Sequence, residues 1–160
     1  NKWNFVGFGN LYGEYNKIYM NIADYDYIKT LGLEILKGRD FSREFPSDVN
    51  SAVIINETFA KKFNINLDEN NRMPGDFTES KIIGIVKDFN YESLHSEIKP
   101  AIIVLHPDHI FKYANDVSVN INPLIFIRIK TENVQETIKK LKTKWENPED
   151  PSAQIGRAHV

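Results

Sequence analysis

The sequence predicts an α+β fold in which helices pack as a layer on a sheet. Two patterns carry this prediction. Short apolar runs of strand length recur along the chain, at residues 52–55, 82–86 and 101–105. Amphipathic helical segments lie between and after them, the clearest at 134–145. The expected element order is β-α-β-β-α-β-β-β-α, which is typical of an α+β layer fold.

The composition limits the classes of function. A chain of 160 residues accommodates one domain, with or without an appendage. Its 41% hydrophobic and 26% charged content is ordinary for an ordered globular protein. A net charge of −2 offers no basic surface, so nucleic acid is not an expected partner. The absence of cysteine excludes thiol catalysis and thiolate zinc sites.

The chain contains no apolar run long enough to span a membrane. The longest runs, 82–86 and 101–105, are far shorter than the roughly 18 apolar residues that a span needs. The chain begins with Asn1 rather than methionine and shows no signal peptide. We therefore expect a fragment of a longer protein, with any membrane spans outside it.

The N-terminal third predicts a strand and a short helix. Residues 1–16, rich in Gly, Asn and aromatics, are expected to form an irregular lead-in. Residues 17–23 alternate in polarity, which indicates a half-buried strand. Asp24 is the expected N-cap of the following helix, because its carboxylate can accept unpaired backbone N–H groups. Gly32 can adopt the left-handed conformation that ends the helix.

Two short strands and a turn should follow. Residues 33–35 alternate as a short strand, and Gly38 permits the turn after it. Residues 42–51 are polar and contain a proline, so we expect a loop. Residues 52–55 are all apolar and should form a buried strand.

The middle of the chain predicts a capped helix and another strand. Asn56 is the expected N-cap of a helix that ends near Phe63. Residues 64–80 are polar and read as a loop, and residues 81–89 read as a strand. Gly84 within that strand indicates a bulge or a close approach of two backbones. One helical turn is expected within 91–98.

The C-terminal third predicts two strands and the longest helix. Residues 101–105 should form a buried strand, 106–115 a loop and 124–130 an alternating strand. Within 134–145 the apolar residues are spaced by four, three and four, with lysines on the far side. Asn133 and Glu136 form a capping-box pair at its start.

The last six residues are encoded, by our interpretation, by a nucleotide sequence that does not belong to the gene. Residues 155–160 read Ile-Gly-Arg-Ala-His-Val, which ATC GGA AGA GCA CAC GTC encodes. That nucleotide string resembles a common sequencing-library adapter. We expect these residues not to be biological, and the parent nucleotide sequence decides the question.

One cluster suggests a metal site. His95, His106, Asp108 and His109 carry ligand atoms that zinc accepts, so a stand-alone metal-dependent hydrolase is an alternative function. Against it, the last three lie in one polar loop and lack the i, i+4 helical spacing that places two ligands on one face.

Four aspartates form a second candidate set for acid–base chemistry or a hard cation: Asp24, Asp26, Asp40 and Asp88. Helix caps and turns favour aspartate in any case, so a structural interpretation is preferred. No P-loop and no Gly-x-Ser-x-Gly nucleophile motif is present.

The most informative stretch is 24–42, with Asp-Tyr near its start and Gly-Arg-Asp-Phe-Ser at its end. Further motifs accompany it: Val-Ile-Ile-Asn-Glu within 52–60, Val-Lys-Asp-Phe and a later Ile-Lys-Pro within 82–100, and the strand and helix expected at 124–145. In this combination the chain resembles the periplasmic core domain of MacB/FtsX-type ABC transporter permeases. The resemblance covers roughly residues 17–148. One departure is 66–75, which contains Pro74-Gly75 but not the Asn-Pro-x-Gly turn usual in that family.

The resemblance implies a mixed sheet with helices packed on it, in an extracytoplasmic (periplasmic) domain mounted between membrane spans. It implies a cytoplasmic ABC ATPase as partner, a permease dimer, and transmission of ATP-driven motion to substrate or partner proteins. It implies no catalytic residues. We also expect no metal site and no cofactor. A soluble extracytoplasmic binding module is a further alternative. The motif residues, to which we assign structural roles, are Asp24, Gly32, Gly38, Arg39, Asp40, Phe41, Asn56, Gly84, Asp88 and Phe89.

Overall fold

The structure is a computed structural model that describes residues 4–9, 15–68, 71–74, 79–90, 97–112, 116–118, 124–130 and 132–145. The chain divides into two compact units, Asn1–Phe126 and Ile127–Val160, and each is treated by itself. Among the described residues, no helix combines the length and apolar character needed to cross a membrane.

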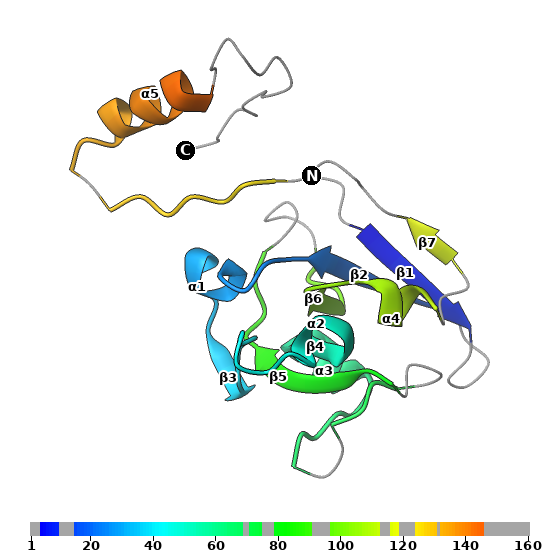
Figure 1. Ribbon diagram of the computed structural model, residues 1–160. Helices are drawn as coiled ribbons and strands as arrows, with labels where there is room; N and C mark the ends of the chain where they lie inside the picture. Colours follow the sequence, from blue (N-terminus) through cyan, green and yellow to red (C-terminus); the bar gives the residue numbers. More distant parts are fainter. Residues whose placement is uncertain are drawn as a thin grey trace. The chain divides into compact units, whose positions relative to one another are not determined.

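The first unit contains all the described strands and four short helices (Figure 1). In chain order these are β1 (Asn4–Gly9), β2 (Tyr15–Ile22), α1 (Tyr27–Leu31), β3 (Ile35–Gly38), α2 (Asp48–Ser51), β4 (Ala52–Asn56), α3 (Glu57–Lys62), β5 (Lys81–Val86), β6 (Ala101–Val104), α4 (Asp108–Phe111) and β7 (Asp116–Ser118). The second unit contains α5 (Val134–Trp145).

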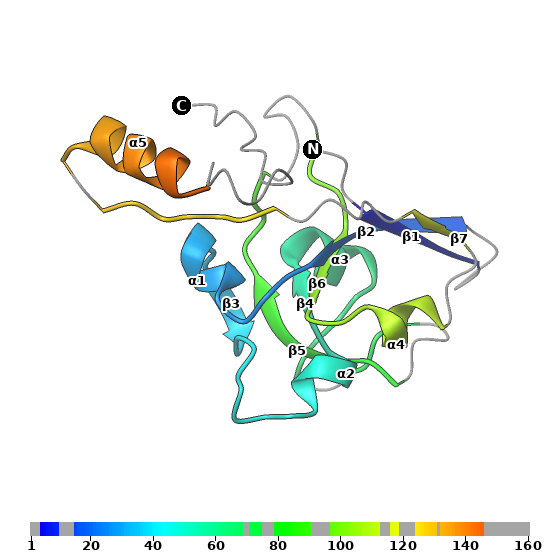
Figure 2. The same cartoon turned by 45° about the horizontal axis from the view of Figure 1, so that its top comes forward.

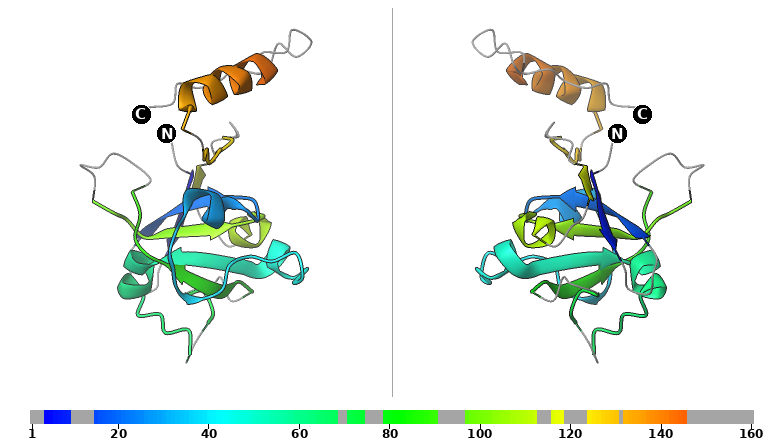
Figure 3. Two further views of the ribbon diagram at one scale, coloured as in Figure 1. Left: turned by 90° about the vertical axis from the view of Figure 1, so that its left-hand side faces the viewer. Right: turned by 90° about the vertical axis from the view of Figure 1, so that its right-hand side faces the viewer.

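The seven described strands form one mixed sheet in the order β3-β5-β4-β6-β2-β1-β7. The pairs β4–β5 and β2–β6 are parallel, and the other neighbours are antiparallel. The left view of Figure 3 shows blue β2, yellow-green β6, cyan β4 and green β5 following one another in that order. The α+β prediction, with helices packed on a mixed sheet, is confirmed.

Both faces of the central strands are buried, because helices pack on each of them. In β4, Val53 and Ile55 join a cluster that includes Phe59 of α3 and Ile110 of α4. Ile54 of the same strand joins a second cluster on the other face, which includes residues of α1. Figure 2 shows α3 beside β4 and β6, and α1 beside β3. Burial on both faces explains why β4 reads as a continuous apolar run rather than an alternating one.

β5 contains the irregularity that its glycine predicted. Val53 pairs with Ile82, but the next residue of β4, Ile54, pairs with Gly84, so Ile83 is an extra residue in the ladder. This is a β-bulge, which bends a strand locally and shifts its side chains to the opposite faces.

Three segments differ from the sequence expectation in being more ordered. Residues 4–9, expected within an irregular lead-in, form β1. The expected loops 42–51 and 106–115 contain α2 and α4. Each of these helices has four residues, too few for a 3.6-residue periodicity to be visible in a sequence.

The start of α1 corrects the prediction for Asp24. The N-cap is Asp26, and Asp24 instead forms the turn before it, where its Oδ1 accepts the Asp26 N–H at 3.0 Å. At the other end Gly32 has the expected left-handed conformation, with φ of 66°. The next N–H, that of Leu33, donates to the Ile28 carbonyl at 2.9 Å and closes the helix. Because Leu33 is used in this way, the strand predicted at 33–35 begins only at Ile35.

Residues 124–130 correct another prediction, because this segment is not a strand in the structure. Its alternating pattern suggested a half-buried strand, yet Leu124, Ile125, Phe126 and Ile127 are all exposed. A strand needs a neighbour with which to form a ladder, and no described strand pairs with this segment.

α5 begins as predicted. The Asn133 Oδ1 accepts the Glu136 N–H at 3.1 Å, and the Asn133 Nδ2 donates to the Glu136 carboxylate at 2.9 Å. The carboxylate therefore binds the side-chain amide rather than the backbone N–H of a standard capping box. The helical turn expected within 91–98 falls mainly on residues 91–96, which lie outside the described residues, as do residues 155–160.

Candidate functional site: two motif corners at opposite ends of the sheet

The motif residues of the first unit gather mainly at two places that lie at opposite ends of β4 and β5. Because these strands are parallel, they begin together where Ala52 pairs with Lys81 and end together where Asn56 pairs with Val86. We call the group at the beginning the Arg39 corner and the group at the end the Asn56 corner. The Arg39 corner comprises Gly38, Arg39, Asp40, Phe41, Asp48 and Gly84. The Asn56 corner comprises Asn56, Glu57, Thr58, Asp88, Lys99 and Ala101.

Two glycines bring backbones together in the Arg39 corner. Gly38 ends β3 with φ of 79° and pairs with Gly84 of β5. A Cβ on Gly38 would lie well inside contact distance of the Ile83 carbonyl oxygen. A Cβ on Gly84 would lie 2.5 Å from the Arg39 carbonyl oxygen. Only glycine at both positions permits this approach, in which the Arg39 N–H donates to the Ile83 carbonyl at 2.9 Å.

Arg39 makes a two-pronged ion pair with a buried carboxylate. Its Nη1 and Nη2 lie 2.6 and 2.8 Å from the two oxygens of Asp48, whose side chain is only 2% exposed. The Ser42 N–H donates to the same carboxylate at 3.1 Å, and the guanidinium lies over the Phe45 ring. Burial opposes ionisation of Asp48, but the hydrogen bonds and charge of Arg39 together with the Ser42 N–H outweigh it and lower the pKa of Asp48.

Asp40 and Phe41 complete the Arg39 corner. The Asp40 Oδ1 accepts the Phe41 N–H at 2.7 Å, and the Phe41 ring is buried against the face of the sheet that α1 covers. Burial raises the pKa of Asp40, the Phe41 N–H lowers it, and the nearby Asp26 charge raises it further. The carboxylate thus fixes the backbone where the chain turns away from β3.

The Asn56 corner is centred on one buried amide. Asn56 is 1% exposed, and its Oδ1 accepts the Phe59 N–H at 3.0 Å and the Ala101 N–H at 2.9 Å. Its Nδ2 donates to the Lys99 carbonyl at 3.0 Å. Asn56 is therefore the expected cap of α3, and it also ties that helix to the start of β6.

Asp88 makes the second tie in this corner. Its two oxygens accept the Thr58 N–H at 3.0 Å and the Thr58 hydroxyl at 2.7 Å. In return the Asp88 N–H donates to the Glu57 carboxylate at 3.1 Å, which lowers the pKa of Glu57. Phe89, the next residue, packs against the α1 face of the sheet. The segment after β5 is thereby fixed to the first turn of α3.

The four aspartates proposed for acid–base chemistry are not assembled into one site. Asp24 and Asp26 precede α1 and Asp40 lies in the Arg39 corner, whereas Asp88 belongs to the Asn56 corner at the other end of the strands. Asp88 and Asp40 each accept backbone N–H groups. The structure thus gives these two carboxylates structural partners.

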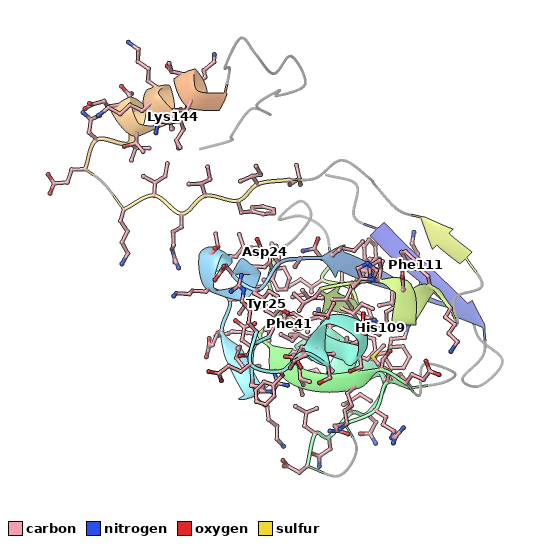
Figure 4. All side chains as sticks on the ribbon, viewed as in Figure 1. Asp24, Tyr25, Phe41, His109, Phe111 and Lys144 are labelled. Carbon is pink, nitrogen blue, oxygen red and sulfur yellow. The ribbon has the colours of Figure 1, made fainter. Side chains whose placement is uncertain are left out.

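The proposed metal cluster is not supported by the described residues. His106 Nδ1 and Asp108 Oδ2 lie 3.6 Å apart and are both exposed, but His109 is buried, with 8% exposure, on α4 (labelled in Figure 4). No three histidine or acidic side chains of the described part of the chain are placed to share a metal ion. His95 lies outside that part.

His109 makes stability depend on pH. Its ring is buried, and burial lowers the pKa of this histidine, although a backbone group of His106 and the charge of Asp108 partly oppose the shift. A lowered pKa in the folded state means that the unfolded chain binds the proton more readily. The stabilising contribution is therefore complete above the ordinary pKa of about 6.5 and is lost as the pH falls through the folded-state pKa.

We expect His109→Leu to reduce the fall in melting temperature between about pH 8 and about pH 5, where histidine changes charge. Leucine fills a similar volume and cannot become charged. His106→Leu is the matched control, because that side chain is 51% exposed on the same short segment. Equal pH profiles for the wild type and His109→Leu would refute the assignment.

A polar hollow of about 400 Å³ lies beside the Arg39 corner, lined by Lys37, Arg39, Asp48, Asp68 and Lys81 among others. Lys37 is paired with Asp68, and Arg39 with Asp48. Two serines also line the hollow, and one of them is engaged, because Ser51 Oγ donates to the Ser47 carbonyl at 2.8 Å.

Sequence reasoning missed several members of these corners. Asp48 lay in an expected loop and had no local signal, because its partner Arg39 is nine positions earlier. Glu57 and Thr58 follow the expected N-cap, and the preference for an acidic residue in a first helical turn is a signal that could have found Glu57. The hydrogen bond between Asn56 and Ala101 joins residues 45 positions apart, and neither local sequence contains a pattern that predicts it.

No family model and no curated protein matches the chain. Solved structures similar to it include three that share low sequence identity with it. The first is a domain of a protein described as a permease from Porphyromonas gingivalis, with 13% identity, 92% of this chain and 70% of that chain covered, and a TM-score of 0.40. The second is the periplasmic region of MacB from Actinobacillus actinomycetemcomitans. It has 12% identity, covers 90% of this chain and 68% of that chain, and has a TM-score of 0.45.

The third is the extracellular domain of the noncanonic ABC-type transporter YknZ from Gram-positive bacteria. It has 16% identity, covers 98% of this chain and 81% of that chain, and has a TM-score of 0.49. The first description names a permease protein, the second MacB and the third an ABC-type transporter.

Proposed function

We propose that this chain is a non-catalytic extracytoplasmic domain of an ABC transporter permease of the MacB/FtsX kind. One observation carries the proposal. The segments of sequence resemblance, 38–42, 52–60 and 82–100, are far apart in the chain but meet in the Arg39 and Asn56 corners. The motif residues of the two corners thus share a structural role, which is to hold the regions at both ends of β4 and β5 in place.

A domain held in place at both ends of its central strands is suited to transmitting motion. A relay passes on a displacement only if the body between its two attachments keeps its shape, because a soft body would absorb the change. Here the Arg39 corner joins β3 to β5 and α2, and the Asn56 corner joins α3 to β6 and to the end of β5. The polar side chains of both corners make structural contacts with backbone groups or with one another.

In the proposed assembly the domain lies outside the membrane, between spans of the permease. A cytoplasmic ABC ATPase supplies the energy, the permease is dimeric, and the domain carries ATP-driven motion to substrate or partner proteins. It needs no cofactor and binds no nucleic acid. The first requirement for testing this is the parent gene with its flanking sequence.

The relay is tested in the full-length permease with its ATPase. Cysteines for spin labels are introduced at Glu44 and Lys62, which are both exposed in the first unit, and any cysteines outside this cysteine-free chain are first replaced. We expect the distance between labels at Glu44 and Lys62 of one domain to stay constant when ATP is added. We expect the distance between Lys62 labels on two protomers to change.

An ATPase whose P-loop lysine is replaced provides the control, in which neither distance should respond. An ATP-independent distance between protomers would refute the relay. A change within one domain would refute the rigid body. Recovery of the parent reading frame separates the alternatives, since apolar stretches of about 20 residues beside this region indicate a permease and their absence a soluble binding module.

A further inference from the structure

α5 presents an apolar stripe to solvent. Val134 and Ile138 are 46% and 43% exposed, and Leu141, one turn further along the same face, is half-buried. The spacing of four and three residues places all three within a narrow band along the helix. A band of this width buries little area, so it would bind a surface only weakly without help from charge.

The charges on α5 supply that help. The helix carries four lysines and one glutamate, a net charge of +3, although the whole chain carries −2. At about 100° per residue, Lys142 and Lys144 lie roughly 70° and 90° to either side of the apolar stripe. The two remaining lysines lie behind them, where Lys140 pairs with Glu136 at 2.7 Å. Figure 4 labels Lys144 on the helix.

We propose that α5 binds along the surface of an anionic phospholipid bilayer, with Val134, Ile138 and Leu141 inserted at its interface. Lysines on the flanks of a shallow apolar stripe can rest their methylene stems on the acyl boundary while their ammonium groups reach lipid phosphates. The charge of the helix is opposite in sign to such a surface and to the rest of its own chain. The inference stands on α5 alone and does not depend on the permease assignment.

The test is flotation of the 160-residue chain with vesicles of phosphatidylglycerol and phosphatidylcholine in equal parts, compared with phosphatidylcholine alone. We expect binding to the anionic vesicles only. It should disappear in about 1 M salt, where the Debye length is about 3 Å. Each lysine near an anionic surface contributes roughly a fivefold gain in affinity.

The double variant Lys142→Glu, Lys144→Glu should therefore lose more than about tenfold in vesicle affinity. Its matched control is Lys61→Glu, Lys62→Glu, which makes the same charge change in the last turn of α3 and should bind like the wild type. Ile138→Ala keeps a helix-forming residue but removes apolar area, and should weaken binding on the order of tenfold. Circular dichroism establishes that each variant is folded.

Several outcomes would overturn the proposal. These are absence of binding to the anionic vesicles at low salt, equal binding to phosphatidylcholine alone, and an equal loss in the two lysine variants. A lower melting temperature for Ile138→Ala without lipid, together with no vesicle binding, would mean that the stripe packs on the chain itself. A dimer in solution that Ile138→Ala dissociates would mean that a second copy covers it.

Discussion

Replacing Gly38 with alanine is expected to lower the free energy of unfolding by about 4 kcal/mol. About 1–2 kcal/mol comes from forcing an L side chain into a φ of 79°. A further 1–3 kcal/mol or so comes from the clash of the new methyl group with the Ile83 carbonyl, which is rigid backbone within the sheet. Chemical denaturation of the purified chain measures the change.

Gly84→Ala separates the two causes. Gly84 does not have a positive φ, and its Cβ would meet the Arg39 carbonyl, so its expected cost of about 2–3 kcal/mol is steric alone. Leu36→Ala is the baseline. Leu36 lies in β3, the edge strand that contains Gly38, and is 45% exposed, so this change should alter stability by less than about 1 kcal/mol. Equal effects at Gly38 and Leu36 would show that the backbones do not approach as described.

Replacing Asn56 with alanine is expected to cost about 3–4 kcal/mol. The loss of a helix cap accounts for about 1 kcal/mol. The remainder arises because the Ala101 N–H and the Lys99 carbonyl also lose their partner, and an unsatisfied buried polar group costs about 1–3 kcal/mol. Amide hydrogen exchange provides a local measurement, since the Phe59 and Ala101 amides should both exchange faster.

Asn50→Ala is the control for this change, because Asn50 is an exposed asparagine in α2. We expect it to alter stability by less than about 0.5 kcal/mol. If Asn56→Ala accelerated exchange at Phe59 but not at Ala101, Asn56 would be an ordinary helix cap and the tie to β6 would be wrong.

The sequence predicted those parts of the fold that depend on local physics. β4 and β6 were recognised because four or five consecutive apolar residues indicate burial on both faces. Gly32 and Asn56 were assigned to helix ends because their conformational and hydrogen-bonding properties favour those positions. Gly84 was expected to mark a bulge or close approach and does both.

The parts that failed depend on partners distant in the chain. The apolar pattern of 124–130 indicated a strand, but a ladder requires a neighbour that the segment itself does not encode. Asp48 can be buried because the guanidinium of Arg39 neutralises the charge of its carboxylate, and no sequence pattern within 42–51 predicts that ion pair. Asp24 was the predicted cap, but its carboxylate accepts the Asp26 N–H in a turn, and this turn geometry makes Asp26 the N-cap.

The position of β6 in the sheet constrains the order in which the domain can fold. β6 lies between β4 and β2, although it follows both of them in the chain by at least 40 residues. During synthesis, β3, β4 and β5 can pair among themselves, and β2 can pair only with β1, until residues 101–104 emerge. The last of these central strands to be made therefore joins two halves that cannot recognise one another without it. Such late, non-local pairing makes folding slow.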